Sequence, residues 1–112
     1  MTRSLTSRGL FLAATLVAAF AAAQVAPIDA KKAKSLFEGH ECAGCHQMET
    51  KLVGPALKQV ADKYRNDGQA ASRLMEKIKH GGVGVWGEIP MPPNAGITEE
   101  ELKLVIAWIL AL

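Results

Sequence analysis

Apolar residues recur at helical spacing along most of the chain. They lie three or four residues apart over residues 31–38, after Asp29, a residue type that caps helices. The same spacing continues over residues 57–64 and 71–80, and Gly81-Gly82 is expected to end the third of these helices. Since no segment alternates apolar and polar residues over a useful length, the pattern predicts an all-α domain of about four helices.

The last helix has the clearest start. Thr98 and Glu101 have the spacing of a capping box, and Ile97 with Leu102 can form the accompanying hydrophobic staple. The apolar face of this helix is expected to be buried, and it consists of Leu102, Val105, Ile106 and Ile109.

Two loops interrupt the helical pattern. Pro55 ends the first loop and is expected at the first position of the following helix. Residues 81–96 hold five glycines and three prolines, which indicates an ordered loop.

The first 23 residues have the pattern of a secretory signal peptide. They contain Arg3 and Arg8 without an acidic residue, then the apolar run 10–20, then Ala21-Ala22-Ala23. An uncleaved membrane anchor is the alternative, but residues 10–23 are shorter than the roughly 20 residues that cross a bilayer. We therefore expect cleavage, export to the periplasm and no stable membrane insertion, with residues 24–112 as the mature domain.

Removal of the leader changes the charge balance. The full chain has 112 residues and a formal charge of +2; without residues 1–23 it has 89, with 11 basic residues against 11 acidic ones. A neutral domain without a basic run has no footprint for nucleic acid. A domain of this size has a small core and often needs a further source of stability. A disulfide between the two cysteines, which are only three positions apart, would close too short a loop to stabilise the domain.

Cys42-Ala-Gly-Cys45-His46 is a C-x-x-C-H motif, the attachment signature of c-type haem. The two thiols can form thioethers to the haem vinyl groups, and the adjacent His46 can then reach the iron from the same side. The haem would also supply apolar volume to a small core. Trp86, Trp108 and the few phenylalanines are expected to pack around it.

The motif has three other interpretations. A thioredoxin-type dithiol would require a neighbouring βαβ pattern, which the sequence lacks. An incidental match or a simple Cys42–Cys45 disulfide is a further alternative. A zinc site would use four neighbouring side chains, although structural zinc usually takes two separated ligand pairs: His40, Cys42, Cys45 and His46.

The second axial ligand of the iron has five candidates. Met48 and His40 are too close to His46 in sequence to reach the other face easily. Met75 fits the apolar stripe of its helix as a core residue, and His80 fits a surface position at a helix C-terminus. Met91 is favoured because the prolines on both sides stiffen its loop and would present the sulfur without much ordering.

The chain resembles the small bacterial class I cytochromes c of the cytochrome c-551 type. The resemblance spans residues 34–108, nearly all of the expected mature domain. It rests on four segments in this order: Cys42-Ala-Gly-Cys-His46, Leu52-Val-Gly-Pro-Ala56, Lys77-Ile-Lys-His-Gly-Gly-Val-Gly-Val-Trp-Gly87 and Ile89-Pro-Met-Pro-Pro-Asn-Ala95.

The resemblance implies a set of site residues. Met91 would be the sixth ligand, and the Pro55 carbonyl would accept the ring N–H of His46. Trp86 and Lys77 would bond a haem propionate, although the family often has Arg where this chain has Lys77.

Asn94 would lie near the ligand sulfur, also by resemblance. With both iron faces held by protein, the expected function is a monomeric periplasmic electron carrier, not an enzyme. Its expected partners are a quinol-oxidising complex, a terminal oxidase, a nitrite reductase or a cytochrome peroxidase. The rival class is a haem protein that binds ligands or acts as a peroxidase, in which Met91 leaves the iron.

Overall fold

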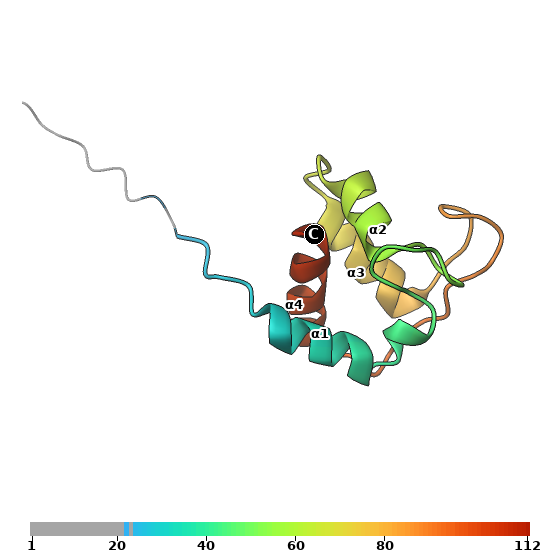
Figure 1. The fold of residues 1–112 in the computed structure, drawn as a ribbon, viewed down its shortest axis with the longest axis horizontal. Helices are drawn as coiled ribbons and strands as arrows, with labels where there is room; N and C mark the ends of the chain where they lie inside the picture. Colours follow the sequence, from blue (N-terminus) through green and yellow to red (C-terminus); the bar gives the residue numbers. More distant parts are fainter. Residues whose placement is uncertain (1–21, 23) are drawn as a thin grey trace, which may run out of the picture.

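The computed structural model describes Ala22 and residues 24–112, so the predicted leader lies outside the described residues except for Ala22. Four α-helices follow one another along the chain, and a short 3-10 turn lies between the first and the second (Figure 1). The prediction of about four helices is confirmed. Their bounds are α1 (Ala30–Gly39), the 3-10 turn η1 (Cys42–Gly44), α2 (Leu57–Tyr64), α3 (Ala70–His80) and α4 (Glu99–Leu110).

Helix α4 is the centre of the core. It packs against α1, α2 and α3, and the four side chains of its predicted buried face are all buried. Leu102 and Ile106 have almost no exposed surface. At the other end of the chain Phe37 of α1 meets Trp108 of α4 edge to face, with ring centroids 5.7 Å apart. The first and last helices are therefore held directly together.

The helix ends follow the predicted caps. Asp29 Oδ1 accepts a hydrogen bond from the Lys32 amide at 2.9 Å. Thr98 and Glu101 form the capping box, with 3.3 Å from the Glu101 amide to Thr98 Oγ1 and 3.0 Å from the Thr98 amide to Glu101 Oε2. Gly81 follows α3 at φ +70°, a conformation that glycine adopts without steric cost.

Two sequence expectations about helix positions were wrong. Pro55 is not the first residue of α2, because the helix begins at Leu57 and Ala56 is its N-cap. Gln59 Oε1 accepts the Ala56 amide at 3.0 Å, which satisfies one donor at this helix start. In α3, Ala70 is the buried alanine and Ala71 is exposed, so the apolar stripe begins one residue earlier than its spacing suggested.

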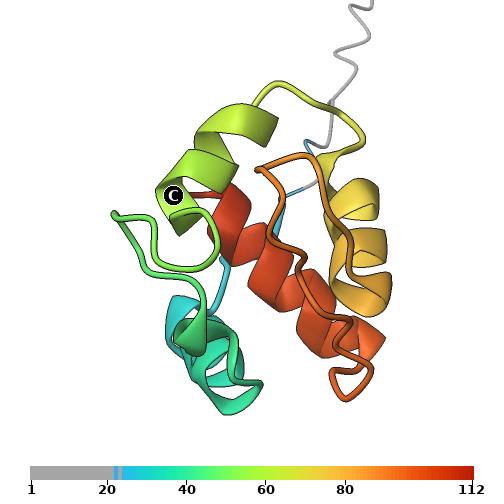
Figure 2. The ribbon, with the colours of Figure 1, turned by 90° about the vertical axis from the view of Figure 1, so that its right-hand side faces the viewer.

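Two loops, residues 45–56 and 81–98, lie on the side of the domain away from the N-terminal segment (Figure 1). Seen from that side, they lie in front of α4 (Figure 2). The first loop is tied back to the chain by backbone hydrogen bonds, among them Gly54 N to Cys45 O at 2.8 Å and Leu57 N to Gln47 O at 2.9 Å. These loops carry the residues of the site described below.

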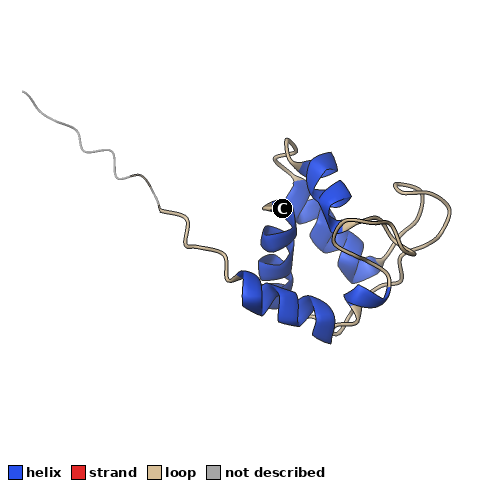
Figure 3. Cartoon of the chain, in the orientation of Figure 1, coloured by secondary structure: helices blue, strands red, loops and turns tan. Residues whose placement is uncertain are grey.

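The described part of the chain consists of helices and loops without strands (Figure 3). Two isolated bridges pair His46 with Lys51 and Gly82 with Met91. None of the helices in the described residues is long and apolar enough to cross a bilayer.

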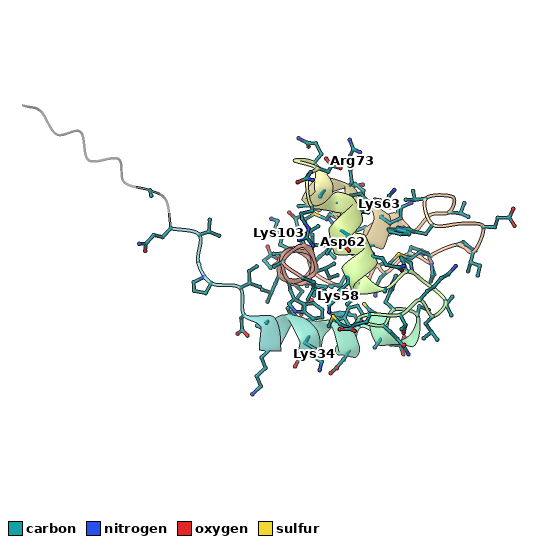
Figure 4. The ribbon with its side chains drawn as sticks, turned by 45° about the horizontal axis from the view of Figure 1, so that its top comes forward. Lys34, Lys58, Asp62, Lys63, Arg73 and Lys103 are labelled. Atoms are coloured by element: carbon teal, nitrogen blue, oxygen red, sulfur yellow. The ribbon has the colours of Figure 1, made fainter. Side chains whose placement is uncertain are left out.

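Charged side chains cover the outside of the helices (Figure 4). Lys34, Lys58 and Lys103 project from α1, α2 and α4, and each pairs with a carboxylate. The shortest of these pairs joins Lys58 Nζ to Glu49 Oε1 at 2.6 Å. Exposed pairs of this kind contribute little to stability.

Candidate functional site

The C-x-x-C-H segment forms a tight turn directly after α1. Glu41 has a left-handed backbone conformation, φ +62°, which turns the chain from the helix into η1. The amides of Cys45 and His46 both donate to the carbonyl oxygen of Cys42, at 3.1 and 3.0 Å. This turn places the two half-buried thiols and the imidazole in one compact segment.

The ring of His46 is held by the loop that follows it. Its Nδ1 lies 2.7 Å from the carbonyl oxygen of Pro55. Because a carbonyl can only accept, Nδ1 is the donor in this contact, and in the neutral tautomer that it favours the Nε2 lone pair is left for a metal. Gly54 lies so close to the ring that a Cβ there would be 2.5 Å from Cε1 of His46.

Met91 is fixed by its own backbone in the second loop. The Met91 amide donates to the Gly82 carbonyl at 2.8 Å, and the Gly82 amide donates to the Met91 carbonyl at 3.0 Å. Further along, the Asn94 amide donates to the Ile78 carbonyl of α3 at 2.8 Å. These hydrogen bonds fix the backbone of Met91 against the end of α3.

The two loops and α4 enclose a cavity of about 620 Å³. Its lining is largely apolar and includes both cysteines, His46 and Met91. Its volume is within the range of small-molecule and cofactor sites. Two thiols, one free imidazole nitrogen and one thioether in a mainly apolar cavity fit a covalently attached haem, which the thiols of Cys42 and Cys45 could bind.

The residues expected around the haem also reach this cavity. Trp86 and Lys77 line it, and Trp86 remains 40% exposed with Lys63 Nζ 5.5 Å from its ring centroid. Asn94 lines the cavity as well. Its Nδ2 donates to the His40 carbonyl at 3.1 Å, and its Oδ1 accepts from the Gly96 amide at 3.2 Å.

Trp108 was expected beside the haem, and this is wrong. It is buried in the helix core against Phe37 and does not line the cavity. Its position on α4, six residues after Leu102, places it on the face that meets α1. The sequence predicted a place for Trp108 around the haem, whereas α4 turns this side chain toward α1.

Three of the other candidate iron ligands, Met48, Met75 and His80, do not line the cavity. Met48 and Met75 are partly buried against the helix core. His80 is exposed at the end of α3, with Nε2 3.3 Å from Glu76. His40 borders the cavity, but its Nε2 lies 3.4 Å from Glu101 of α4.

The alternative interpretations of the motif lack support in the structure. Among the described residues, no group of three or more His, Cys, Asp or Glu side chains could hold a metal ion. Burial raises the pKa of the Cys42 thiol, with the neighbouring Cys45 adding to the effect against a backbone hydrogen bond that lowers it. A redox dithiol needs the opposite shift, toward the thiolate.

Comparison with known proteins identifies the family of the chain. Residues 30–112 match the cytochrome c family. The chain is 49% identical to cytochrome c-552 of Nitrosomonas europaea over 105 residues, 93% of each protein, and 50% identical to cytochrome c-551 of Stutzerimonas stutzeri over 86 residues, 77% of this chain and 82% of the relative. The crystal structure of wild-type Nitrosomonas europaea cytochrome c552 superposes with a TM-score of 0.68 at 49% identity, covering 70% of this chain and 98% of that one.

The fold and the site define a haem-binding electron-transfer protein of the small, all-α, class I type. The chain belongs to the cytochrome c family, with the monohaem cytochromes c-551 and c-552 as its relatives. Its cofactor is one covalently bound haem c with iron, and it is an electron carrier, not an enzyme.

Proposed function

We propose that this chain is a periplasmic single-electron carrier in which His46 and Met91 bind the haem iron from opposite faces. The observation that carries the proposal is the cavity that both residues line, each held by its own loop. Haem iron supplies the one-electron chemistry by cycling between ferric and ferrous states.

His46 is prepared for ligation by its hydrogen bond to Pro55. The bond fixes the tautomer and the ring orientation, as partners beyond the ligand usually do at metal sites. Gly54 contributes by leaving room for the ring. The imidazole therefore needs no rearrangement to coordinate.

Met91 would supply the second ligand. A neutral thioether opposite an imidazole favours the ferrous state and raises the reduction potential. With both axial positions taken by side chains, no position remains for a substrate, which favours electron transfer over catalysis. The apolar lining of the cavity keeps water from the iron.

The positions of Lys77 and Trp86 on the cavity wall support a role for both in binding a haem propionate. A lysine provides a point charge there without the fork of an arginine. Asn94, on the same loop as Met91, would lie near the ligand sulfur.

Export and partners complete the proposal. Residues 1–23 would direct the chain to the periplasm and be removed, which leaves the domain 24–112. The monomeric carrier would exchange electrons with a quinol-oxidising complex and with a terminal oxidase, nitrite reductase or cytochrome peroxidase. Such redox encounters bury little surface and are short-lived.

Spectroscopy of the purified holoprotein tests the proposal. Alkaline pyridine treatment should give the spectrum of a thioether-linked haem, and the ferric protein should show the near-infrared absorption of sulfur ligation. The ferrous protein should bind carbon monoxide slowly. Rapid carbon monoxide binding without the near-infrared band would instead identify a ligand-binding or peroxidase-like haem protein.

Mass measurement of the periplasmic protein tests export. A haem-bearing chain without the leader is the expected product. A chain that still begins at Met1 or Thr2 would contradict cleavage.

A further inference from the structure

His40 lies where three parts of the domain meet. It directly follows α1, and its carbonyl oxygen accepts a hydrogen bond from Nδ2 of Asn94 at 3.1 Å. Its imidazole Nε2 lies 3.4 Å from Oε2 of Glu101, in the first turn of α4. One residue thus joins α1, α4 and the loop that carries Met91.

The Asn94 contact ties that loop to the opposite wall of the cavity. The loop is attached to the end of α3 through the Gly82–Met91 pair and through the Asn94 amide. The side chain of Asn94 then reaches His40, 54 positions earlier in the chain. Since His40 is two residues before Cys42, this hydrogen bond links the methionine loop to the haem-attachment turn.

Glu101 provides a fixed negative charge beside His40. Its carboxylate accepts hydrogen bonds from the amide and hydroxyl of Thr98, each at 3.0 Å. These bonds, with a smaller contribution from His40, hold the pKa of Glu101 below its usual range. The carboxylate therefore stays ionised throughout the neutral pH range.

Histidine is the side chain whose charge ordinarily changes between about pH 5 and 8. The His40 and Glu101 side chains are 22% and 33% exposed, so water screens the pair only in part. With a protonated imidazole the contact is an ion pair, and with a neutral one it joins an uncharged ring to a carboxylate. The extra attraction exists only in the protonated form and is lost on deprotonation.

Few other charges bear on this contact. From α4, Glu101 faces the imidazole, while Glu99 is engaged by Lys79 and Lys103. The methionine loop contributes the uncharged Asn94. Near His40 in the sequence, Glu38 pairs with Lys34, and Glu41 is exposed. The Cys42 thiol does not titrate once it is a thioether.

We propose that His40 is a positioning residue for the iron-ligating loop, which holds the loop more tightly when its imidazole is protonated than when it is neutral. The ion pair with Glu101 fixes the end of α1 against α4, and the carbonyl oxygen that receives Asn94 is fixed with it. This proposal rests on the proposed ligation of iron by Met91.

Carbon monoxide binding to the ferrous holoprotein measures the opening of the loop, because Met91 must leave the iron first and carbon monoxide does not titrate. Between about pH 5.5 and 8.5 the rate for the wild type should rise about two- to five-fold, the size expected for loss of a partly exposed ion pair. Three variants should abolish this rise. His40→Gln and Glu101→Gln should be uniformly fast, and His40→Lys uniformly slow.

The variants separate a positioning role from a loss of folding. Glu101→Gln keeps the capping box, because glutamine also serves at this position. His80→Gln is a matched control, since His80 Nε2 lies 3.3 Å from Glu76 within α3, on side chains 73% and 67% exposed. It should retain the full wild-type pH dependence.

The outcomes also separate this proposal from the proposed function. A pH-dependent rate that persists in His40→Gln, or that disappears in His80→Gln, would overturn the role of His40. A slow rate in the wild type that does not vary with pH would do the same and leave Met91 ligation intact. Immediate carbon monoxide binding at every pH would overturn the ligation itself.

Discussion

Gly54 lies against the imidazole of His46 with no room for a side chain between them. A Cβ at residue 54 would be 2.5 Å from Cε1, 2.9 Å from Nδ1 and 3.0 Å from Nε2 of the ring. We expect Gly54→Ala to tilt the ring away from Pro55, to lower stability by about 1–3 kcal/mol, the cost of overpacking a filled site, and to change the haem spectrum. Chemical denaturation and absorption spectroscopy measure both effects.

Gly39→Ala is the control for this substitution. A Cβ at Gly39 meets no atom within 4 Å, and the residue lies at the end of α1. This change should leave the spectrum unaltered and should be neutral or stabilising by up to about 1 kcal/mol. Equal effects of the two alanines would show that contact with His46 is not the reason for a glycine at position 54.

Met91→Ala should keep the haem covalently attached but leave one iron face open. The near-infrared band of sulfur ligation should disappear, the reduction potential should fall, and exogenous ligands should bind. Potentiometry and ligand titration measure these changes. An unaltered spectrum would remove Met91 from the iron.

Met75→Ala removes a methionine that packs against the helix core instead. Because Met75 is only partly buried, the variant should lose at most about 2 kcal/mol of stability. Its near-infrared band and reduction potential should match those of the wild type.

Replacement of either motif cysteine tests the structural role of the cofactor. Cys42→Ala or Cys45→Ala leaves one thioether, so haem attachment should be impaired and the protein should unfold at lower denaturant concentration. The cavity of about 620 Å³ is apolar volume that the side chains alone do not fill. A variant that lacks both cysteines yet folds normally without haem would contradict this role.

Thr98→Ala should destabilise α4 in a pH-dependent manner. Loss of the cap typically costs about 1 kcal/mol. Hydrogen bonds from the amide and the hydroxyl of Thr98 lower the pKa of Glu101, and the variant loses only the hydroxyl. The stabilisation from the hydroxyl bond is complete above the ordinary glutamate pKa and is lost as the pH falls through the lowered one. The difference in unfolding free energy between variant and wild type should therefore shrink in acid, and a constant difference would argue against this coupling.

Local signals in the sequence predicted the helices well. The Asp29 cap, the Thr98–Glu101 capping box and the glycine at position 81 each act within a few residues, and each is present in the structure. The apolar stripe of α4 is buried at every predicted position. Pro55 was wrongly predicted to be the first residue of α2, because a proline suits the first turn of a helix. Its carbonyl oxygen instead accepts a hydrogen bond from His46, and the helix starts two residues later.

The contacts around the cavity join distant parts of the chain, so the pattern of a single segment does not predict them. The closeness of His40 to His46 in the sequence argues against iron ligation, but it does not predict the contacts with Asn94 and Glu101, which join residues more than 50 positions apart. The need for glycine at position 54 appears only once the ring of His46 is in place. The position of Trp108 was predicted wrongly because its partner Phe37 is at the other end of the domain.

The central place of α4 has a consequence for the order in which the chain can fold. Helices α1, α2 and α3 pack mainly on α4 and hardly on one another. Until residues 99–110 have been synthesised, the earlier helices have no common surface, and isolated helices of 8 to 11 residues are unstable in water. A chain that lacks residues 99–110 therefore has no surface on which its other helices can pack, and the domain closes only when its last helix docks.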